Sequence, residues 1–380
     1  MDGLQRGSAA IVGVAEADLG AVAPDMSAID LMAQGIQRAL NDCGLRLSDV
    51  DGLLCATAQS RTSGLSLAEY LGISPAFIDT TILGGSSFMF HVAHAQAALQ
   101  LGLCKVAVIA YGSTQRTIGR RQASVREYNP YETPFRPFLP STAYALAASR
   151  HMHEFGTTRE QLAAVAVAAR EWALLNPAAW EKKPLTIPEV LSARMISYPF
   201  TVRDCCLLTD GGGAVILTSA ERARDLKQKP AYVMASAQGS DFRQGATAEN
   251  GPDYATSNFK TLAPRLYAMA GIEPKDVDVA QVYENFTGAV MTSIVEHGFC
   301  HPDEVMDFCT FENLTAPNGK LPINTSGGNL AECYMHGLEL IIEAARQVRG
   351  TSTCQVKDAE ISMVVSGPMV APVSDLILRG

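Results

Sequence analysis

One pattern occurs twice in this chain of 380 residues and constrains how it can fold. The pattern is a glycine, four residues and then Asp-Val-Asp, and it lies at 44–51 and again at 271–278. Each copy follows a segment of helical character, at 28–43 and at 256–270, and precedes a short apolar run. A glycine can end a helix in the left-handed conformation, and aspartates favour the turn before a strand. Each half of the chain is therefore expected to contain a helix–turn–strand unit.

The two copies continue to correspond further along the chain. In both, a Gly-Gly pair precedes a helical segment and then an apolar strand: Gly84-Gly85, 86–102 and 106–110 in the first half, and Gly327-Gly328, 329–349 and 361–365 in the second. Each half also opens on a strand, at 10–14 and at 231–235. Such self-similarity is typical of a duplicated α/β unit, and it predicts two halves at 1–225 and 230–380.

The helical segment 86–102 carries apolar residues on nearly all of its faces, among them Phe88, Met89, Phe90 and Val92. A helix of this kind is buried on every side, so it needs a layer of structure above and below it. Two sheets that share central helices would supply those layers. The expected architecture is therefore a five-layer α/β/α/β/α sandwich.

The composition excludes several classes of function. The net charge is −9 and no stretch is rich in Lys and Arg, which disfavours nucleic-acid binding. No run approaches about 18 uninterrupted apolar residues and no signal peptide is evident, so no membrane segment is expected. The nine cysteines form no C-x-x-C pair. Reduced thiols, a cytoplasmic location and no metal site are expected.

Three motifs carry the candidate chemistry: 83–87, which reads Leu-Gly-Gly-Ser-Ser, 282–286, which reads Val-Tyr-Glu-Asn-Phe, and the long run 324–337. Tyr283 falls at the end of an apolar strand, where open α/β sheets build sites. Tyr334 is expected in the first turns of the helix 329–349, whose start has capping-box spacing. Taken alone, each tyrosine could equally be a core residue with a satisfied hydroxyl.

These motifs resemble the active-site loops of the thiolase superfamily, in its sterol-carrier-protein-x branch. Thiolases carry a nucleophilic cysteine in the first loop, a histidine after the second glycine-rich turn and Asn or His in the third segment. Here the resemblance places Gly84, Tyr334 and Tyr283 at those positions. Two tyrosines and no nucleophilic cysteine are similar to a narrower group, the steroid side-chain-cleaving aldolases of lipid-transfer-protein type.

The resemblance implies the thiolase fold, built from duplicated βαβαβαββ halves, with residues 115–200 forming a loop domain that covers the substrate. It also implies an activity. A thiolase needs a nucleophile to carry an acyl group, whereas retro-aldol cleavage of a β-hydroxyacyl-CoA releases a ketone and a shorter thioester. The expected substrate is a steroid or bile-acid side chain, and the expected product is propionyl-CoA or acetyl-CoA.

In this interpretation Tyr334 takes the proton from the β-hydroxyl and Tyr283 protonates the enolate, and the opposite assignment stays open. Backbone N–H groups near Gly85 and Ser86, and near Ser366 and Gly367, are expected as donors to the oxyanion. His336 and Asn285, beside the tyrosines, are further candidates for contact with the substrate. On a helix His336 would point well away from Tyr334, so it is expected to contact CoA or to support the site indirectly, although a role as the base also stays open.

Two other functions remain open at this point. One is a thiolase or Claisen-type enzyme with a displaced cysteine, and the other is a non-catalytic lipid-binding subunit. The family resemblance implies a homodimer that pairs with a small DUF35 protein, made of a zinc ribbon and an OB fold, as a heterotetramer. A CoA thioester is expected as substrate, with no tightly bound cofactor.

Overall fold

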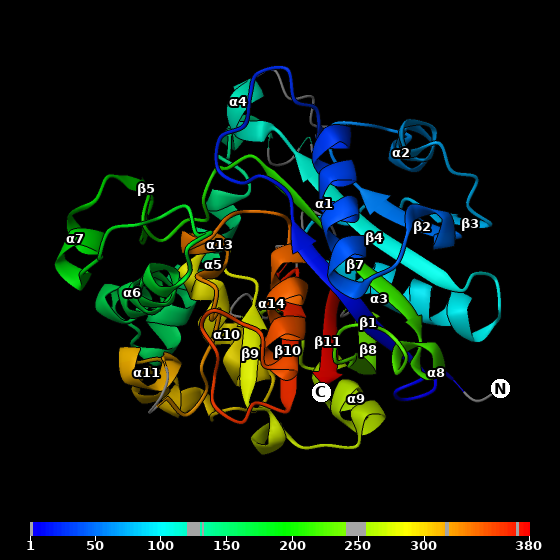
Figure 1. The fold of residues 1–380 in the computed structure, drawn as a ribbon. Coiled ribbons are helices and arrows are strands. Elements are labelled where there is room, and N and C mark those ends of the chain that lie inside the picture. The colour runs from blue at the N-terminus through cyan, green and yellow to red at the C-terminus, as the bar shows by residue number, and fades with distance from the viewer. Residues whose placement is uncertain (1–2, 120–129, 131–132, 241–255, 316–318, 370–371) are drawn as a thin grey trace.

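The computed structural model describes residues 3–119, 130, 133–240, 256–315, 319–369 and 372–380. Within this part of the chain, nine strands form one mixed sheet in the order β3-β2-β4-β7-β1-β8-β11-β10-β9 (Figure 1). Their bounds are β1 Ala9–Glu16, β2 Gly52–Ala56, β3 Phe77–Asp79, β4 Val106–Ser113, β7 Gly211–Ser219, β8 Ala231–Gly239, β9 Val279–Val282, β10 Ile361–Ser366 and β11 Val373–Arg379. Two short strands, β5 Met195–Ser197 and β6 Phe200–Thr201, pair separately.

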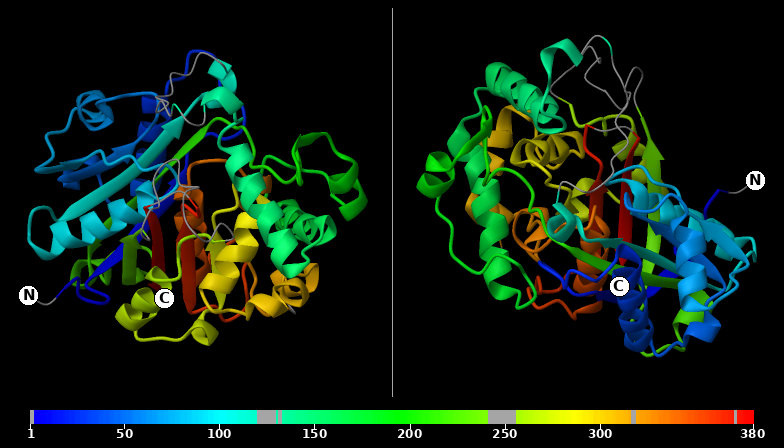
Figure 2. Two further views of the ribbon diagram at one scale, coloured as in Figure 1. Left: turned by 180° about the vertical axis from the view of Figure 1, so that it is seen from behind. Right: turned by 90° about the horizontal axis from the view of Figure 1, so that it is seen from above.

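The longer helices are α1 Ala28–Cys43, α2 Ser63–Leu71, α3 Ser87–Gln100, α5 Ser141–Phe155, α6 Arg159–Leu175, α9 Leu262–Ala270, α10 Thr287–Glu296 and α14 Leu338–Arg349. Shorter ones are α4 Gln115–Ile118, α7 Ile187–Ser192, α8 Ala220–Ala223, α11 Val305–Phe308, α12 Phe311–Leu314 and α13 Gly328–Ala331. Helices α5 to α7 lie on the side of the molecule opposite to α2 and β3 (Figures 1 and 2).

The topology of the sheet repeats itself. The parallel pair β2–β4 continues through antiparallel β7 and β1, and the parallel pair β9–β10 continues through antiparallel β11 and β8. The last aspartate of each copy accepts a hydrogen bond from the first residue of the neighbouring parallel strand. The Asp51 carboxylate accepts the Val106 N–H at 2.8 Å, and the Asp278 carboxylate accepts the Ile361 N–H at 2.8 Å. The same strand topology and the same aspartate contact therefore occur in both halves of the sheet, as a duplicated unit would give.

The layers follow from the burial of the helices. The apolar residues of α3 and α14 pack in one core with inward-facing residues from both halves of the sheet, including Leu54, Val215, Val364 and Leu376. Helices α1 and α2 cover the outer face of the first half, and α9 and α10 cover that of the second. Figure 2 shows α9 and α10 on the face turned away from α14. The α/β thiolase-type architecture with central helices is confirmed.

Two expectations need correction. The two halves do not form separate sheets, because β1 and β8 pair over Ala10–Tyr232 and Ile11–Ala231 at one end. The helix expected at 329–349 is interrupted, since α13 ends at Ala331 and α14 begins at Leu338. His336 and Gly337 lie at φ 54° and 91°, in the left-handed region, which breaks the helix before α14. Residues 332–337 form a non-helical bridge between the two helices.

Part of the expected loop region, 120–129 and 131–132, lies outside the described residues. The expected loop region 115–200 contains two of the longer helices, α5 and α6. Within the described residues no helix is long and apolar enough to cross a membrane.

Candidate active site

Two parallel strands end beside each other and bring the site together. Tyr283 directly follows β9, and its N–H donates to the Val365 carbonyl of β10 at 2.9 Å. Ser366 is the last residue of β10. The start of α3, at Ser86, lies against the end of β10, because the Ser86 hydroxyl donates to the Ser366 carbonyl at 3.3 Å. The carboxyl ends of the strands therefore meet a helix N-terminus, as sites in α/β proteins commonly do.

The tyrosines that the sequence singled out lie in contact. Their hydroxyl oxygens are 2.8 Å apart, and their ring centroids are 6.3 Å apart at an interplanar angle of 59°. Tyr283 is 3% exposed and Tyr334 is half-buried. One phenol therefore donates a hydrogen bond to the other in a largely dry environment.

Burial raises the pKa of both phenols well above the ordinary value of a tyrosine. Each pKa is raised chiefly because the protein removes the phenolate from water. Both tyrosines are therefore neutral at physiological pH. A neutral hydrogen-bonded pair can accept a proton at one oxygen while it releases another proton from the second oxygen.

The ring of His336 lies closer to the ring of Tyr334 than it would if both residues belonged to one continuous helix. Its ring is 5.1 Å from the ring of Tyr334 in an edge-to-face arrangement, and 5.6 Å from that of Tyr111. The expectation that it points away from Tyr334 was wrong, because residues 332–337 are not helical. Burial lowers the pKa of His336 to about 4, so the imidazole is neutral.

The loop at Gly85 and Ser86 and the loop at Ser366 and Gly367 are held to each other by their serines. The Ser366 hydroxyl donates to the Gly85 carbonyl at 2.5 Å. Gly367 lies against Ser86 so closely that a Cβ at position 367 would come within 2.0 Å of the Ser86 Oγ. The hydroxyls therefore hold the loops together. The backbone N–H groups at the start of α3, which have no acceptor within the helix, remain the candidate oxyanion donors.

Two glycines, Gly85 and Gly337, leave the room that Tyr283 occupies. A Cβ at Gly85 would lie 2.7 Å from Cζ of Tyr283, and a Cβ at Gly337 would lie 3.3 Å from its Cδ2. A Cβ at Gly84 would meet nothing within 4 Å. Position 85 therefore has no room for a side chain while Tyr283 is in place. Neither Gly84 nor Gly85 carries a side chain that could act as a nucleophile.

Asn285 is placed differently from the other candidates. Its carbonyl accepts the Cys206 N–H at 2.9 Å, and its side chain is buried. In the described part of the chain its Oδ1 has no hydrogen-bond partner. No hydrogen bond to either tyrosine hydroxyl is found for it among the described residues, so the structure does not bring Asn285 into the phenol pair.

Two buried glutamates behind the site were missed by sequence reasoning. Burial raises the pKa of Glu284 and of Glu339 to about 8 each. The Glu339 carboxylate accepts the Gly337 N–H at 3.1 Å, and Glu284 accepts from the Leu330 N–H at 3.4 Å. The available signal was a carboxylate close in sequence to each of the motifs that carry Tyr283 and Tyr334. Glu284 directly follows Tyr283, and Glu339 lies in the first turn of α14.

Helix α5 from the expected loop region lies over the site. The Tyr144 hydroxyl donates to the Pro368 carbonyl at 2.6 Å, and its ring lies 4.7 Å from that of Phe286. These contacts join α5 to the loop after β10 and to the segment after Tyr283.

No cysteine is activated. Burial raises the pKa of all nine thiols, so none favours the thiolate at neutral pH. Cys333, next to Tyr334, is fully buried. Within the described residues, no group of three or more His, Cys, Asp or Glu side chains could hold a metal ion.

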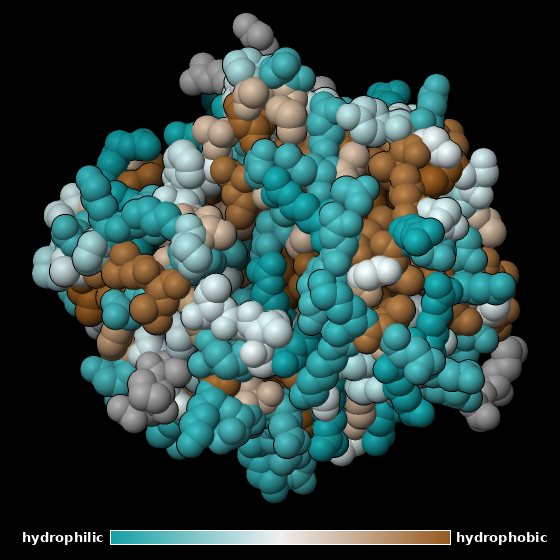
Figure 3. Space-filling model, in the orientation of Figure 1, coloured by the Kyte–Doolittle hydropathy of each residue, from teal (hydrophilic) through white to brown (hydrophobic). Residues whose placement is uncertain are grey.

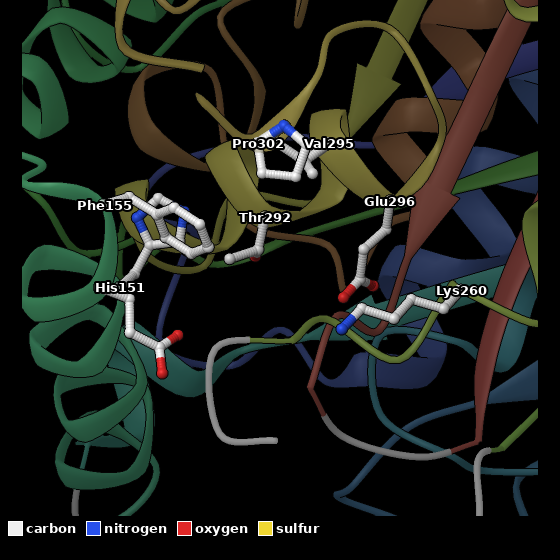
Figure 4. A pocket seen from close by; sticks show the side chains of 8 residues that line it. His151, Phe155, Lys260, Thr292, Val295, Glu296 and Pro302 are labelled. Carbon is white, nitrogen blue, oxygen red and sulfur yellow. The ribbon is translucent and has the colours of Figure 1, made fainter. Parts of the chain in front are cut away.

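A separate hollow of about 100 Å³ lies between α5 and α10, and both tyrosines are outside its lining. Figure 4 shows Lys260 reaching toward Glu296 in it, with His151 and Phe155 on the α5 side. The Glu296 carboxylate already accepts backbone N–H groups from Ser257 at 3.0 Å and Phe259 at 2.8 Å.

Comparisons with known proteins identify the family to which the chain belongs. Residues 241–378 match the family model of the thiolase C-terminal domain-like family. The chain is 35% identical to a steroid side-chain-cleaving aldolase of Thermomonospora curvata, over 98% of each chain. It is also 35% identical to the 17-hydroxy-3-oxo-4-pregnene-20-carboxyl-CoA lyase of Mycobacterium tuberculosis, over 98% of this chain and 99% of that protein.

A solved structure of the Ltp2-ChsH2(DUF35) aldolase superposes with a TM-score of 0.90 at 34% identity, covering 99% of both chains. Near-complete coverage at this identity, together with the fold and the loops around the phenol pair, determines the family. The chain belongs to the thiolase superfamily, in the branch of the steroid side-chain-cleaving aldolases, and it is a carbon–carbon lyase of that branch.

Proposed function

We propose that this protein performs retro-aldol cleavage of a β-hydroxyacyl-CoA at the Tyr283–Tyr334 pair. The observation that carries the proposal is the 2.8 Å contact between the two phenol oxygens, in a site with no activated thiol. The bond between the α- and β-carbons breaks, and the β-carbon becomes a ketone carbonyl. The other fragment is the enolate of a shorter CoA thioester.

The phenol pair meets the proton balance of this reaction. The β-hydroxyl loses one proton and the α-carbon gains one, so no net proton is needed. One phenol oxygen accepts the hydroxyl proton while its own proton moves along the 2.8 Å contact. The second phenol releases its proton to the enolate carbon. Because the pair moves protons in concert, neither tyrosine needs to exist as a free phenolate, which its raised pKa disfavours.

In our proposal Tyr334 faces the β-hydroxyl and Tyr283 protonates the α-carbon. Tyr334 is the more exposed of the two, which suits contact with the substrate hydroxyl. The enolate oxygen is stabilised by backbone N–H groups of Gly85 and Ser86 and of the loop at Ser366 and Gly367. The neutral imidazole of His336 donates to the substrate beside Tyr334.

The proposed substrate is a steroid side chain carried on CoA, and the thioester product is propionyl-CoA or acetyl-CoA. Support comes from the relatives, one of which is named for steroid side-chain cleavage and another for a pregnene carboxyl-CoA. CoA acts as part of the substrate, and no tightly bound cofactor is proposed.

We also propose a DUF35 partner and a homodimer, which together form a heterotetramer. The related solved structure is named as a complex with a DUF35 protein. For the dimer, hydrophobic side chains are exposed at one edge of the sheet: Leu65 on α2, Ile78 on the edge strand β3 and Ile82 just after it. Figure 3 shows hydrophobic residues gathered over this region. Exposed apolar patches next to a free sheet edge favour association. The unpaired cysteines fit a cytoplasmic location.

The two alternatives predict different products. A thiolase would consume free CoA with a β-ketoacyl substrate, and a non-catalytic subunit would convert nothing. The test incubates the full chain, alone and with its DUF35 protein, with β-hydroxyacyl-CoAs of small and of steroid size, and identifies products by mass. A ketone and a shortened CoA ester from the steroid substrate support the proposal. Consumption of CoA, or no product in either sample, rejects it.

A further inference from the structure

The segment 204–210 lies between the two parts of the chain that carry the tyrosines. On one side, the Cys206 N–H donates to the Asn285 carbonyl at 2.9 Å, two residues after Tyr283. On the other side, the Leu207 N–H donates to the Asn329 carbonyl of α13 at 2.8 Å. The segment 204–210 therefore connects the segment after Tyr283 with helix α13, which precedes Tyr334, through main-chain hydrogen bonds.

Thr209, in this segment, holds the main chain of Tyr334. Its Oγ1 accepts the Tyr334 N–H at 2.9 Å, and the residue is fully buried. Tyr334 lies in the bridge after α13 has ended at Ala331, so no helical carbonyl is available to its N–H. A buried N–H without an acceptor destabilises the folded protein. The Thr209 hydroxyl can accept the Tyr334 N–H only when residues 332–337 hold Tyr334 in this one position.

Thr209 is itself held in place. The next residue, Asp210, is fully buried, and its carboxylate accepts the N–H groups of Arg116 at 2.7 Å and Thr117 at 3.0 Å. Its own N–H donates to the Gly20 carbonyl at 2.9 Å, and β7 begins one residue later. The acceptor that Thr209 offers to Tyr334 is therefore fixed to the central sheet.

We propose that Thr209 is a positioning residue for Tyr334. The Thr209 hydroxyl fixes the main chain of Tyr334 and thereby sets the contact between the two phenols. The inference rests on the proposed function, because positioning has a kinetic consequence only if the phenols act on substrate. Displacing a reacting group by about 1 Å can lower turnover on the order of 100-fold.

The test compares three variants of the full chain. Thr209→Val keeps the shape and removes the acceptor, and Thr209→Ser keeps the hydroxyl. Thr218→Val is the matched control, because Thr218 is equally buried but lies at the far end of β7, where its hydroxyl donates to the Lys105 carbonyl at 2.7 Å.

Thr209→Val is expected to lower kcat by roughly ten-fold or more with KM changed by less than about three-fold, because substrate contacts are kept. Thr209→Ser should restore kcat to within about three-fold of the wild type, and Thr218→Val should keep the wild-type kcat. If Thr209→Val does not fold, Thr209→Cys, with a weak acceptor at the same place, replaces it.

A second measurement does not need turnover. Hydrogen exchange of the Tyr334 amide should be faster in Thr209→Val than in the wild type, and should stay at the wild-type rate in Thr209→Ser and Thr218→Val. The proposal is overturned by a wild-type kcat in Thr209→Val, by equal losses of kcat in Thr209→Val and Thr209→Ser, or by unchanged exchange. If the wild type cleaves no substrate, the proposed function fails, and the exchange measurement alone decides whether Thr209 fixes Tyr334.

Discussion

The phenol oxygens of Tyr283 and Tyr334 lie 2.8 Å apart although the residues are 51 positions apart in the chain. Tyr283 is placed by the end of β9, and Tyr334 by the non-helical bridge before α14. Their contact joins the motif at 282–286 to the run at 324–337, so that the two tyrosines form one pair of neutral acids.

Gly85→Ala should disable the site through Tyr283. The added Cβ would lie 2.7 Å from the Tyr283 Cζ, so the buried ring of Tyr283 would have to shift. We expect cleavage to fall roughly ten-fold or more, measured as kcat with a β-hydroxyacyl-CoA. Gly156→Ala, in open space at the end of α5, is the control, and its φ of 71° adds a backbone strain that Gly85→Ala does not carry. Equal rates for the two variants would contradict the role given to Gly85.

The stability of the protein should fall as the pH rises through the range in which Glu339 titrates. The pKa of this carboxyl is raised from 4.5 to about 8 by burial, so between these values the folded protein holds a proton that the unfolded chain has released. The stability from this group is fully present below about 4.5 and is lost as the pH approaches 8.

Glu339→Gln should therefore reduce the difference between urea midpoints measured at pH 5 and pH 8. Glu69→Gln, at an exposed position of α2, is the control and should leave the difference unchanged. A pH dependence that is identical in Glu339→Gln and in the wild type would show that the carboxyl does not titrate in this window.

His336 should act without changing its charge. Because burial lowers its pKa to about 4, the imidazole stays neutral between pH 5 and pH 8. We expect His336→Gln, which keeps a donor, to raise KM more than it lowers kcat, and His336→Phe to be the weaker enzyme. An inflection in the wild-type rate profile within this range that disappears in His336→Gln would instead identify the imidazole as the base.

Thiol alkylation should leave cleavage intact. The pKa of the Cys333 thiol is raised well above its ordinary value by burial, and that of Cys206 is raised in the same way. Treatment with iodoacetamide, followed by mass analysis of the labelled sites and a cleavage assay, should leave Cys206 and Cys333 unlabelled and the protein active. Loss of activity in proportion to the labelling of one cysteine would favour a thiolase-type nucleophile.

The sequence predicted the parts of this fold that depend on local patterns. The segment 28–43 was predicted as helical before the glycine of the repeat, and in the structure α1 has these bounds, with Ser27 at its N-cap and Gly44 at its C-cap. The all-apolar segment 86–102 revealed the central position of α3. The interruption of the helix at 329–349 could not be predicted, since His336 at φ 54° is set by tertiary contacts and not by its residue type.

The site was predicted unevenly for the same reason. Tyr283 and Tyr334 follow from motif position, and the structure brings them together. The hydroxyls of Ser86 and Ser366 bond the two loops to each other, which the sequence did not indicate, and the backbone N–H donors expected in these loops stay a prediction. Thr209 had no sequence signal, because its role depends on the missing helical acceptor for Tyr334. Long-range hydrogen bonds of this kind are not encoded in a local pattern.

The most direct test of the account measures cleavage of a steroid-type β-hydroxyacyl-CoA by Tyr283→Phe and Tyr334→Phe. Each change removes one hydroxyl of the pair and keeps the ring, so the melting temperature should change little. We predict that each variant loses roughly 100-fold or more in kcat, and that the double variant is no worse than the poorer single one, because the phenols act as one unit. Wild-type rates of ketone and shortened CoA ester formation in either folded variant would contradict proton transfer through the phenol pair.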